Sequence, residues 1–203
     1  MILSFLISAL IGYFLGSIPF GWLLTRFTGY GDIRGIGSGS IGATNVLRTG
    51  NKKLAILTLL LDGVKGAFAL VLVSLLFPAP YFLLYITGFC ALLGHMFPLW
   101  LKWKGGKGVA TALGVLLVLS WPVGLAALAT WMVTAAFSRI SSLASLVAAS
   151  LSPTFAFFLG KDQNLPLFCA LTAMLIIVKH RSNIGRLRRG EEPKIGQKKK
   201  DPA

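Results

Sequence analysis

Four short polar stretches, separated by long apolar segments, contain the residue types that could do chemistry in this chain. They are DIRGIGSGSIGATNVLR at residues 32–48, KWKGGKGVAT at 102–111, SRISS at 138–142 and KHRSNIGR at 179–186. Glycines let backbone N–H groups approach an anion closely, and hydroxyl and cationic side chains add further donors. The residue types therefore favour sites that bind an anion such as phosphate. The alternative for each stretch is a flexible loop or turn without a binding role.

The first stretch contains GSGSIG at residues 37–42, a formal match to the dinucleotide-binding pattern GxGxxG. That pattern binds a dinucleotide only between a strand and a helix of a βαβ unit. The neighbouring apolar segments predict membrane helices and no such unit, so we exclude a dinucleotide site. A phosphate cradle and a flexible Gly/Ser loop both stay open.

The second stretch places three lysines around Gly105 and Gly106, directly before a predicted helix. It is not a Walker loop, because Leu101 and Gly108 occupy positions where that motif needs Gly and Ser or Thr. A helix N-terminus flanked by cations suits an anion. Positive anchoring of a membrane helix is the alternative, but it does not explain glycines that lower helix stability.

In the fourth stretch, His180 and Asn183 are three residues apart, so they share one face of a helix. His180 could be a general base, a phosphate ligand or an interfacial side chain. Inside the apolar segments, Asp62 and Lys65 could be functional, but we favour a structural pair for them and a packing role for His95. No His, Cys, Asp or Glu cluster has metal-ligand spacing, so we expect no metal and no cofactor.

Composition predicts that membrane helices position these stretches. The 203 residues are 55% hydrophobic and 13% charged, whereas soluble domains contain about 25% charged residues. Two cysteines do not make a disulfide scaffold. The net charge of +14 favours an anionic partner. We expect no nucleic acid, because the basic loops are short and flank apolar segments.

The apolar segments that approach the roughly 20 residues of a membrane span predict several transmembrane helices. Residues 108–138 carry no charge and could form one long helix or two short helices broken at 120–122. The five other candidates are Met1–Leu24, Leu54–Phe77, Tyr81–Leu101, Ser142–Leu159 and Leu165–Val178.

Basic residues concentrate on the cytoplasmic side of membrane proteins, which decides between these alternatives. With two middle helices, 18 of the 20 basic residues lie on one side and only Lys161 lies on the other. We therefore predict an all-α integral membrane protein with seven transmembrane helices, its N-terminus outside and its C-terminus inside. The two middle helices would have about 15 residues each, short for a span.

We predict one transmembrane domain at residues 1–187. Residues 188–203 are charged and contain Pro and Gly, so we expect a basic, disordered cytoplasmic tail.

Taken together, the polar stretches resemble the bacterial acyl-phosphate:glycerol-3-phosphate acyltransferases, the PlsY family. The resemblance runs from residue 16 to about 186. One departure is Ser40, where the family usually has Asn within GSGN. The matching pieces are GSIP at 16–19, GATNVLR at 42–48, DGVKG at 62–66, GH at 94–95, GGKGVAT at 105–111 and HRSNI at 180–184.

The resemblance implies transfer of a fatty acyl group from acyl phosphate to the first hydroxyl of glycerol 3-phosphate. The products would be lysophosphatidic acid and phosphate, in the first step of phospholipid synthesis at the bacterial cytoplasmic membrane. Membrane lipid and the peripheral enzyme that makes acyl phosphate are further implied partners. Soluble-type glycerolipid acyltransferases use H-x4-D, which is absent because Trp100 and Gly185 stand five residues after the two histidines.

The same resemblance implies that Ser38, Lys107 and His180 are catalytic, with the single transmembrane domain forming the catalytic unit. We favour direct transfer without an acyl-enzyme, with Ser38 as a binding or orienting hydroxyl. Ser141 is an alternative to Ser142. The expected substrate and phosphate contacts are Arg48, Ser142, Asn183, Gly105, Gly106 and, as weaker candidates in the same motif, Thr44 and Asn45.

A membrane transporter for phosphate esters or other anions is the alternative function. It would share the apolar spans and the basic loops. Transporters, however, place their binding groups near the bilayer midplane on broken helices. The polar stretches here cluster at one predicted face, which favours an enzyme.

Overall fold

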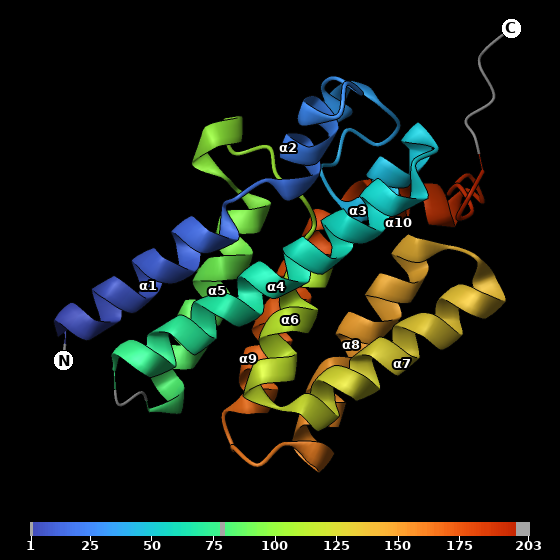
Figure 1. The fold of residues 1–203 in the computed structure, drawn as a ribbon. Helices are drawn as coiled ribbons and strands as arrows, with labels where there is room; N and C mark the ends of the chain where they lie inside the picture. The colour runs from blue at the N-terminus through green and yellow to red at the C-terminus, as the bar shows by residue number, and fades with distance from the viewer. Residues whose placement is uncertain (1, 78–79, 198–203) are drawn as a thin grey trace, which may run out of the picture.

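The computed structural model describes residues 2–77 and 80–197, and this part of the chain is helical without any strand (Figure 1). The all-α prediction is confirmed. The α-helices are α1 Ile2–Gly16, α2 Phe20–Phe27, α3 Ala43–Val46, α4 Lys52–Leu76, α5 Tyr81–Met96, α6 Val109–Leu119, α7 Trp121–Ser138, α8 Ser141–Leu159, α9 Leu165–Lys179 and α10 Arg181–Arg188. Short 3-10 helices are η1 Ile33–Gly35, η2 Leu47–Thr49 and η3 Leu99–Leu101.

Within the described residues, five helical segments are long and apolar enough to cross a membrane. They comprise α1 with α2, α4, α5 with η3, α7 and α8. A sixth candidate is α9 with α10, which are bent by 65° relative to each other, and α6 is a shorter apolar helix. These lengths fit the predicted integral membrane protein, whereas the number of seven spans and their orientation stay predictions.

The charge-free segment at 108–138 is divided at Ser120, as the sequence predicts, but its two helices differ in length. Ser120 is extended, and Pro122 lies in the first turn of α7, where its missing N–H costs nothing. The short helix is α6, with 11 residues, which span only about 17 Å. In contrast, α7 has 18 residues and is longer than predicted, because no charged residue interrupts it before Ser138.

Glycines allow close contact between α1 and α5. A Cβ atom at Gly12 or Gly16 would overlap the backbone of Thr87 or Ala91 in α5. Small residues let membrane helices approach until their backbones touch. The contact therefore requires glycine at these two positions. It holds the loop that follows α1 against the end of α5.

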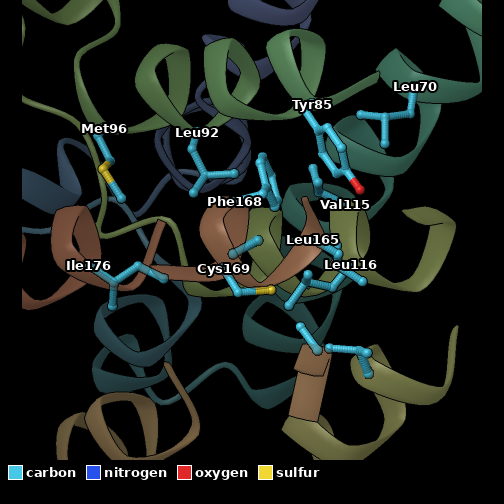
Figure 2. Packing of buried hydrophobic residues seen from close by; sticks show 13 residues of the cluster. Leu70, Tyr85, Leu92, Met96, Val115, Leu116, Leu165, Phe168, Cys169 and Ile176 are labelled. Atoms are coloured by element: carbon cyan, nitrogen blue, oxygen red, sulfur yellow. The ribbon is translucent and has the colours of Figure 1, made fainter. Parts of the chain in front are cut away.

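A buried apolar cluster joins α4, α5, α6 and α9 (Figure 2). Leu70 of α4, Leu92 of α5 and Val115 of α6 are fully buried, and Phe168 of α9 packs in the same cluster. This core fixes the relative positions of the four helices. In Figure 1, α2, α3 and α10 lie together at one end of the bundle, where the polar stretches also meet.

Candidate active site

The four polar stretches of the sequence meet at this end of the bundle. Thr44 Oγ1 lies 3.1 Å from Ser141 Oγ and so connects the first stretch to the third. Lys107 Nζ donates a hydrogen bond of 2.6 Å to Asn183 Oδ1 and connects the second stretch to the fourth. Residues far apart in the sequence therefore form one polar site.

The carboxylate of Glu192 lies inside this site. Ser142 Oγ and Asn183 Nδ2 donate to its Oε1 at 2.7 and 2.6 Å, and Arg186 Nε donates to its Oε2 at 2.7 Å. Burial acts to raise the pKa of Glu192, but these three hydrogen bonds and the charge of Arg186 together lower it. The donors of the site are thus arranged to hold an anion.

The disordered tail at residues 188–203 stays a prediction, but the described part of this segment makes specific contacts. Besides Glu192, the N–H of Ile195 donates to the carbonyl of Arg139 at 2.7 Å, which attaches the segment to the α7–α8 loop. The rest of the predicted tail, residues 198–203, lies outside the described residues. The tail prediction relied on composition, and composition does not register single contacts of this kind.

Lys107 lies between the glycine loop and the first turn of α6. Gly108 has φ of +82°, a left-handed conformation that L side chains rarely adopt, and it turns the chain into the helix. Burial lowers the pKa of Lys107 to about 8; the charge of Glu192 opposes this shift, and the charges of Arg186 and Arg48 add to it. Lys107 is still mainly protonated at pH 7, so it can receive negative charge.

The N–H groups of Gly105 and Gly106 are already used within the protein. They donate to the carbonyls of Met96 at 3.3 Å and His95 at 3.0 Å. The expectation that these two amides bind phosphate therefore does not match this geometry. The first turn of α6 offers N–H groups that have no partner within the helix, which makes it the better phosphate donor in this loop.

Asn45 organises the first loop from within, in contrast to the expected phosphate contact. Its side chain is buried, and its Oδ1 accepts from the N–H and the hydroxyl of Ser38 at 3.1 and 3.3 Å. Its Nδ2 donates to the carbonyls of Ile33, Ile36 and Ser40 at 2.8–3.0 Å. Asn45 thus positions the exposed Ser38.

We expect Asn45→Ala to destabilise the protein, because it leaves buried polar groups of the loop without partners at about 1–3 kcal/mol for each group. The apparent Tm in detergent should fall by about 2–4 °C per kcal/mol for a chain of this size. Thr44→Ala is the matched control, since Thr44 is exposed and loses only its contact with Ser141. Equal Tm values for the two variants would contradict the organising role.

Arg48 packs against Gly37, next to Ser38. Gly37 has φ of +56°, and a Cβ atom there would overlap Arg48 and Asn45. Burial lowers the pKa of Arg48, and the charge of Glu192 opposes that shift. The guanidinium is therefore a partly desolvated cation beside the predicted serine.

His180 is buried between α9 and α10. Its Nδ1 lies 2.8 Å from the carbonyl of Ile176, so the ring proton is on Nδ1 and Nε2 is left as an acceptor. Burial, together with the charge of Lys107, lowers the pKa of His180 to about 4. The imidazole is consequently neutral at pH 7 and able to take a proton at Nε2.

Comparison with known proteins identifies the family. The family model described as Glycerol-3-phosphate acyltransferase matches residues 6–190. The chain belongs to this family. A glycerol-3-phosphate acyltransferase of Jannaschia sp. (strain CCS1) is 56% identical over 94% of this chain and 93% of its own length. Its counterpart in Paramagnetospirillum magneticum is 57% identical over 93% of this chain and 92% of its own.

Solved structures support the same family and the membrane fold. The chain is similar to a crystal structure of PlsY (YgiH), an integral membrane glycerol 3-phosphate acyltransferase, in its glycerol 3-phosphate form. The TM-score is 0.89 at 39% identity, covering 95% of this chain and 96% of the other. The lysophosphatidic acid form of that protein gives a TM-score of 0.86 at 38% identity, with the same coverage. The resemblance stated from the sequence is confirmed, and the chain is a multi-pass membrane protein.

In this member of the acyltransferase family, the structure places the predicted site residues at one end of the bundle, but the polar groups of Asn45, Gly105 and Gly106 bond within the protein. Ser142 contacts the Glu192 carboxylate and Ser141 contacts Thr44, so both serines lie at the site. Sequence reasoning missed Glu192 and Arg186. The available signal was the acidic pair at 191–192 within an otherwise basic segment.

Proposed function

We propose that this protein transfers a fatty acyl group from acyl phosphate to the first hydroxyl of glycerol 3-phosphate, giving lysophosphatidic acid and inorganic phosphate. The observation that carries the proposal is the convergence of Lys107, Ser142 and Asn183 from three separate segments, with Ser142 and Asn183 donating to one carboxylate and Lys107 donating to Asn183. This is a preorganised anion site in a protein whose relatives are glycerol-3-phosphate acyltransferases.

The cations of the site suit the leaving group. Acyl phosphate is an activated mixed anhydride, and its phosphate leaves more easily when its growing charge is stabilised. Lys107, Arg48 and the N–H groups at the start of α6 would supply that stabilisation. Arg48 and Arg186 are both close enough to Lys107 to lower its pKa, so the cations form one cluster. Two phosphates bound side by side there would also gain from proximity.

The neutral His180 suits the role of proton acceptor. In the proposed step, the hydroxyl oxygen of glycerol 3-phosphate forms a bond to the acyl carbonyl carbon, and the carbon–oxygen bond to phosphate breaks. The hydroxyl proton goes to Nε2 of His180. Ser38 fits a binding role better than a nucleophilic one, because its hydroxyl donates to the amide oxygen of Asn45, which is no base.

We further propose that the protein lies in the bacterial cytoplasmic membrane with this site facing the cytoplasm. The support is the excess of basic residues in the loops of the site end, which is the pattern of cytoplasmic loops. Membrane lipid and the peripheral enzyme that makes acyl phosphate are the proposed partners on that side.

The test uses purified protein in detergent with synthetic palmitoyl phosphate and labelled glycerol 3-phosphate. We expect lysophosphatidic acid and phosphate in equal amounts, and no product when glycerol replaces glycerol 3-phosphate. The same preparation in liposomes separates the transporter alternative. Uptake of labelled glycerol 3-phosphate without product in either assay would overturn the enzyme proposal.

A further inference from the structure

Asp62 and Lys65 of α4 and His95 of α5 form a buried polar cluster beneath the site, and the proposed reaction makes no direct use of it. The three residues are only 2–4% exposed. Lys65 Nζ lies 2.7 Å from Asp62 Oδ1, 2.9 Å from His95 Nδ1 and 2.7 Å from the carbonyl of Ile18. Charged groups within membrane segments are costly and usually serve a function.

The hydrogen bonds of Lys65 determine the tautomer of His95. An ammonium group has three N–H donors and no acceptor, and the three contacts of Lys65 use all of them. With Lys65 charged, Nδ1 of His95 accepts from it, and the proton of the neutral ring lies on Nε2. The ring is held in one orientation by α4.

The cluster contacts the segment that carries Lys107 at both of its ends. On one side, a Cβ atom at Gly106 would overlap the His95 ring at Nε2, and the N–H of Gly106 donates to the His95 carbonyl at 3.0 Å. On the other side, Thr111 Oγ1 donates to the main-chain carbonyl of Asp62 at 2.9 Å. Lys107 lies one residue from the first contact and four from the second.

We propose that Asp62, Lys65 and His95 are positioning residues that hold the 106–111 segment, and with it the Lys107 ammonium, in place for transfer. The proposal rests on the proposed function, because Lys107 acts there on the leaving phosphate. A cluster of apolar side chains could fill the same space with a similar or smaller free-energy cost of burial. An ionic cluster with directed hydrogen bonds instead specifies one ring orientation and one loop position.

His95→Asn tests this role with the least disturbance. Its side-chain oxygen can still accept from Lys65, but the shorter side chain no longer reaches Gly106. We expect kcat to fall at least about tenfold. Tyr85→Phe is the control on the same helix, since it removes a hydrogen bond of 2.8 Å to Asp162 at the opposite end of α5. We expect Tyr85→Phe to keep the wild-type kcat even if its Tm is lower.

A double-mutant cycle separates positioning from folding. Gly106→Ala alone should be severely impaired, because its methyl group overlaps the His95 ring. In the His95→Asn background the same methyl group should cost at least about tenfold less in kcat, since the ring is gone. Additive effects on kcat, or a wild-type kcat in His95→Asn, would overturn the proposal.

Amine labelling provides a readout that needs no activity. Acetic anhydride reacts with neutral amines, so peptide mass spectrometry against pH gives the pKa of Lys107, which is about 8 in the folded protein. In His95→Asn we expect a rise toward the ordinary value of about 10.4, and no rise in Tyr85→Phe. An unchanged midpoint in His95→Asn would refute the positioning role. If the rise occurs but wild type makes no lysophosphatidic acid, only the proposed function fails.

Discussion

Lys107→Ala is expected to lower turnover about 10²–10³-fold, the usual cost of removing one donor that stabilises developing charge. The lysine lies beside the start of α6 and bonds to Asn183 at the centre of the site. Its substitution by Ala leaves a cavity at a polar site end, away from the apolar core, so the protein should still insert and fold. Product formation from saturating acyl phosphate measures the effect.

Lys104→Ala is the matched control, because Lys104 is exposed on the same loop. It should stay within about threefold of wild type, since exposed charges away from reacting groups contribute little. If turnover of Lys107→Ala also stays within about threefold of wild type, the Lys107 ammonium does not act on the leaving group. If size-exclusion chromatography shows that Lys107→Ala does not fold, Lys107→Met replaces it in the test, because Met keeps the packing of the side-chain stem.

The same lysine predicts an alkaline limit of activity. Burial lowers the pKa of Lys107 to about 8, so the ammonium is present below that pH and is lost above it. The kcat/KM of the wild type, which reports groups of the free enzyme, should therefore fall as pH rises through about 8. Lys107→Arg stays charged at any of these pH values and should lack this fall, whatever its absolute rate.

The donor should be acyl phosphate, with thioesters of coenzyme A or acyl carrier protein used at least about 10²-fold less efficiently. A thioester presents no phosphate on the reacting carbonyl, so Lys107, Arg48 and the α6 N-terminus could not bind its leaving group and would stabilise less of the transition state. Turnover with glycerol 3-phosphate and each donor at equal concentration in detergent measures the difference.

Inorganic phosphate serves as the internal check on this donor prediction. As a product that occupies the leaving-group position, it should compete with acyl phosphate, and the competition should weaken in Arg48→Ala. Comparable turnover of acyl-CoA and acyl phosphate would contradict a site built for two phosphates. If acyl phosphate is preferred but inorganic phosphate does not compete with it, then the protein recognises the acyl chain or the carrier of the donor and not the leaving phosphate.

Much of the fold and part of the site follow from local sequence. The long apolar segments, the break at Ser120 and the short α6 could be predicted, because helix formation in a membrane depends on the summed hydropathy of neighbouring residues. The glycines beside Lys107 likewise mark a loop at a helix start, since they are unfavourable within a helix. Such features need no knowledge of what packs against them.

Only the tertiary structure decided which polar groups are free to act. Asn45 turns inward to bind its own loop, the N–H groups of Gly105 and Gly106 bond to α5 carbonyls, and Glu192 enters the site from a segment that looks disordered by composition. Asp62 and His95 come within reach of Gly106 and Thr111 because α4, α5 and α6 pack closely. The physical reason is that a hydrogen bond depends on distances across helices, which hydropathy and spacing along the chain do not encode.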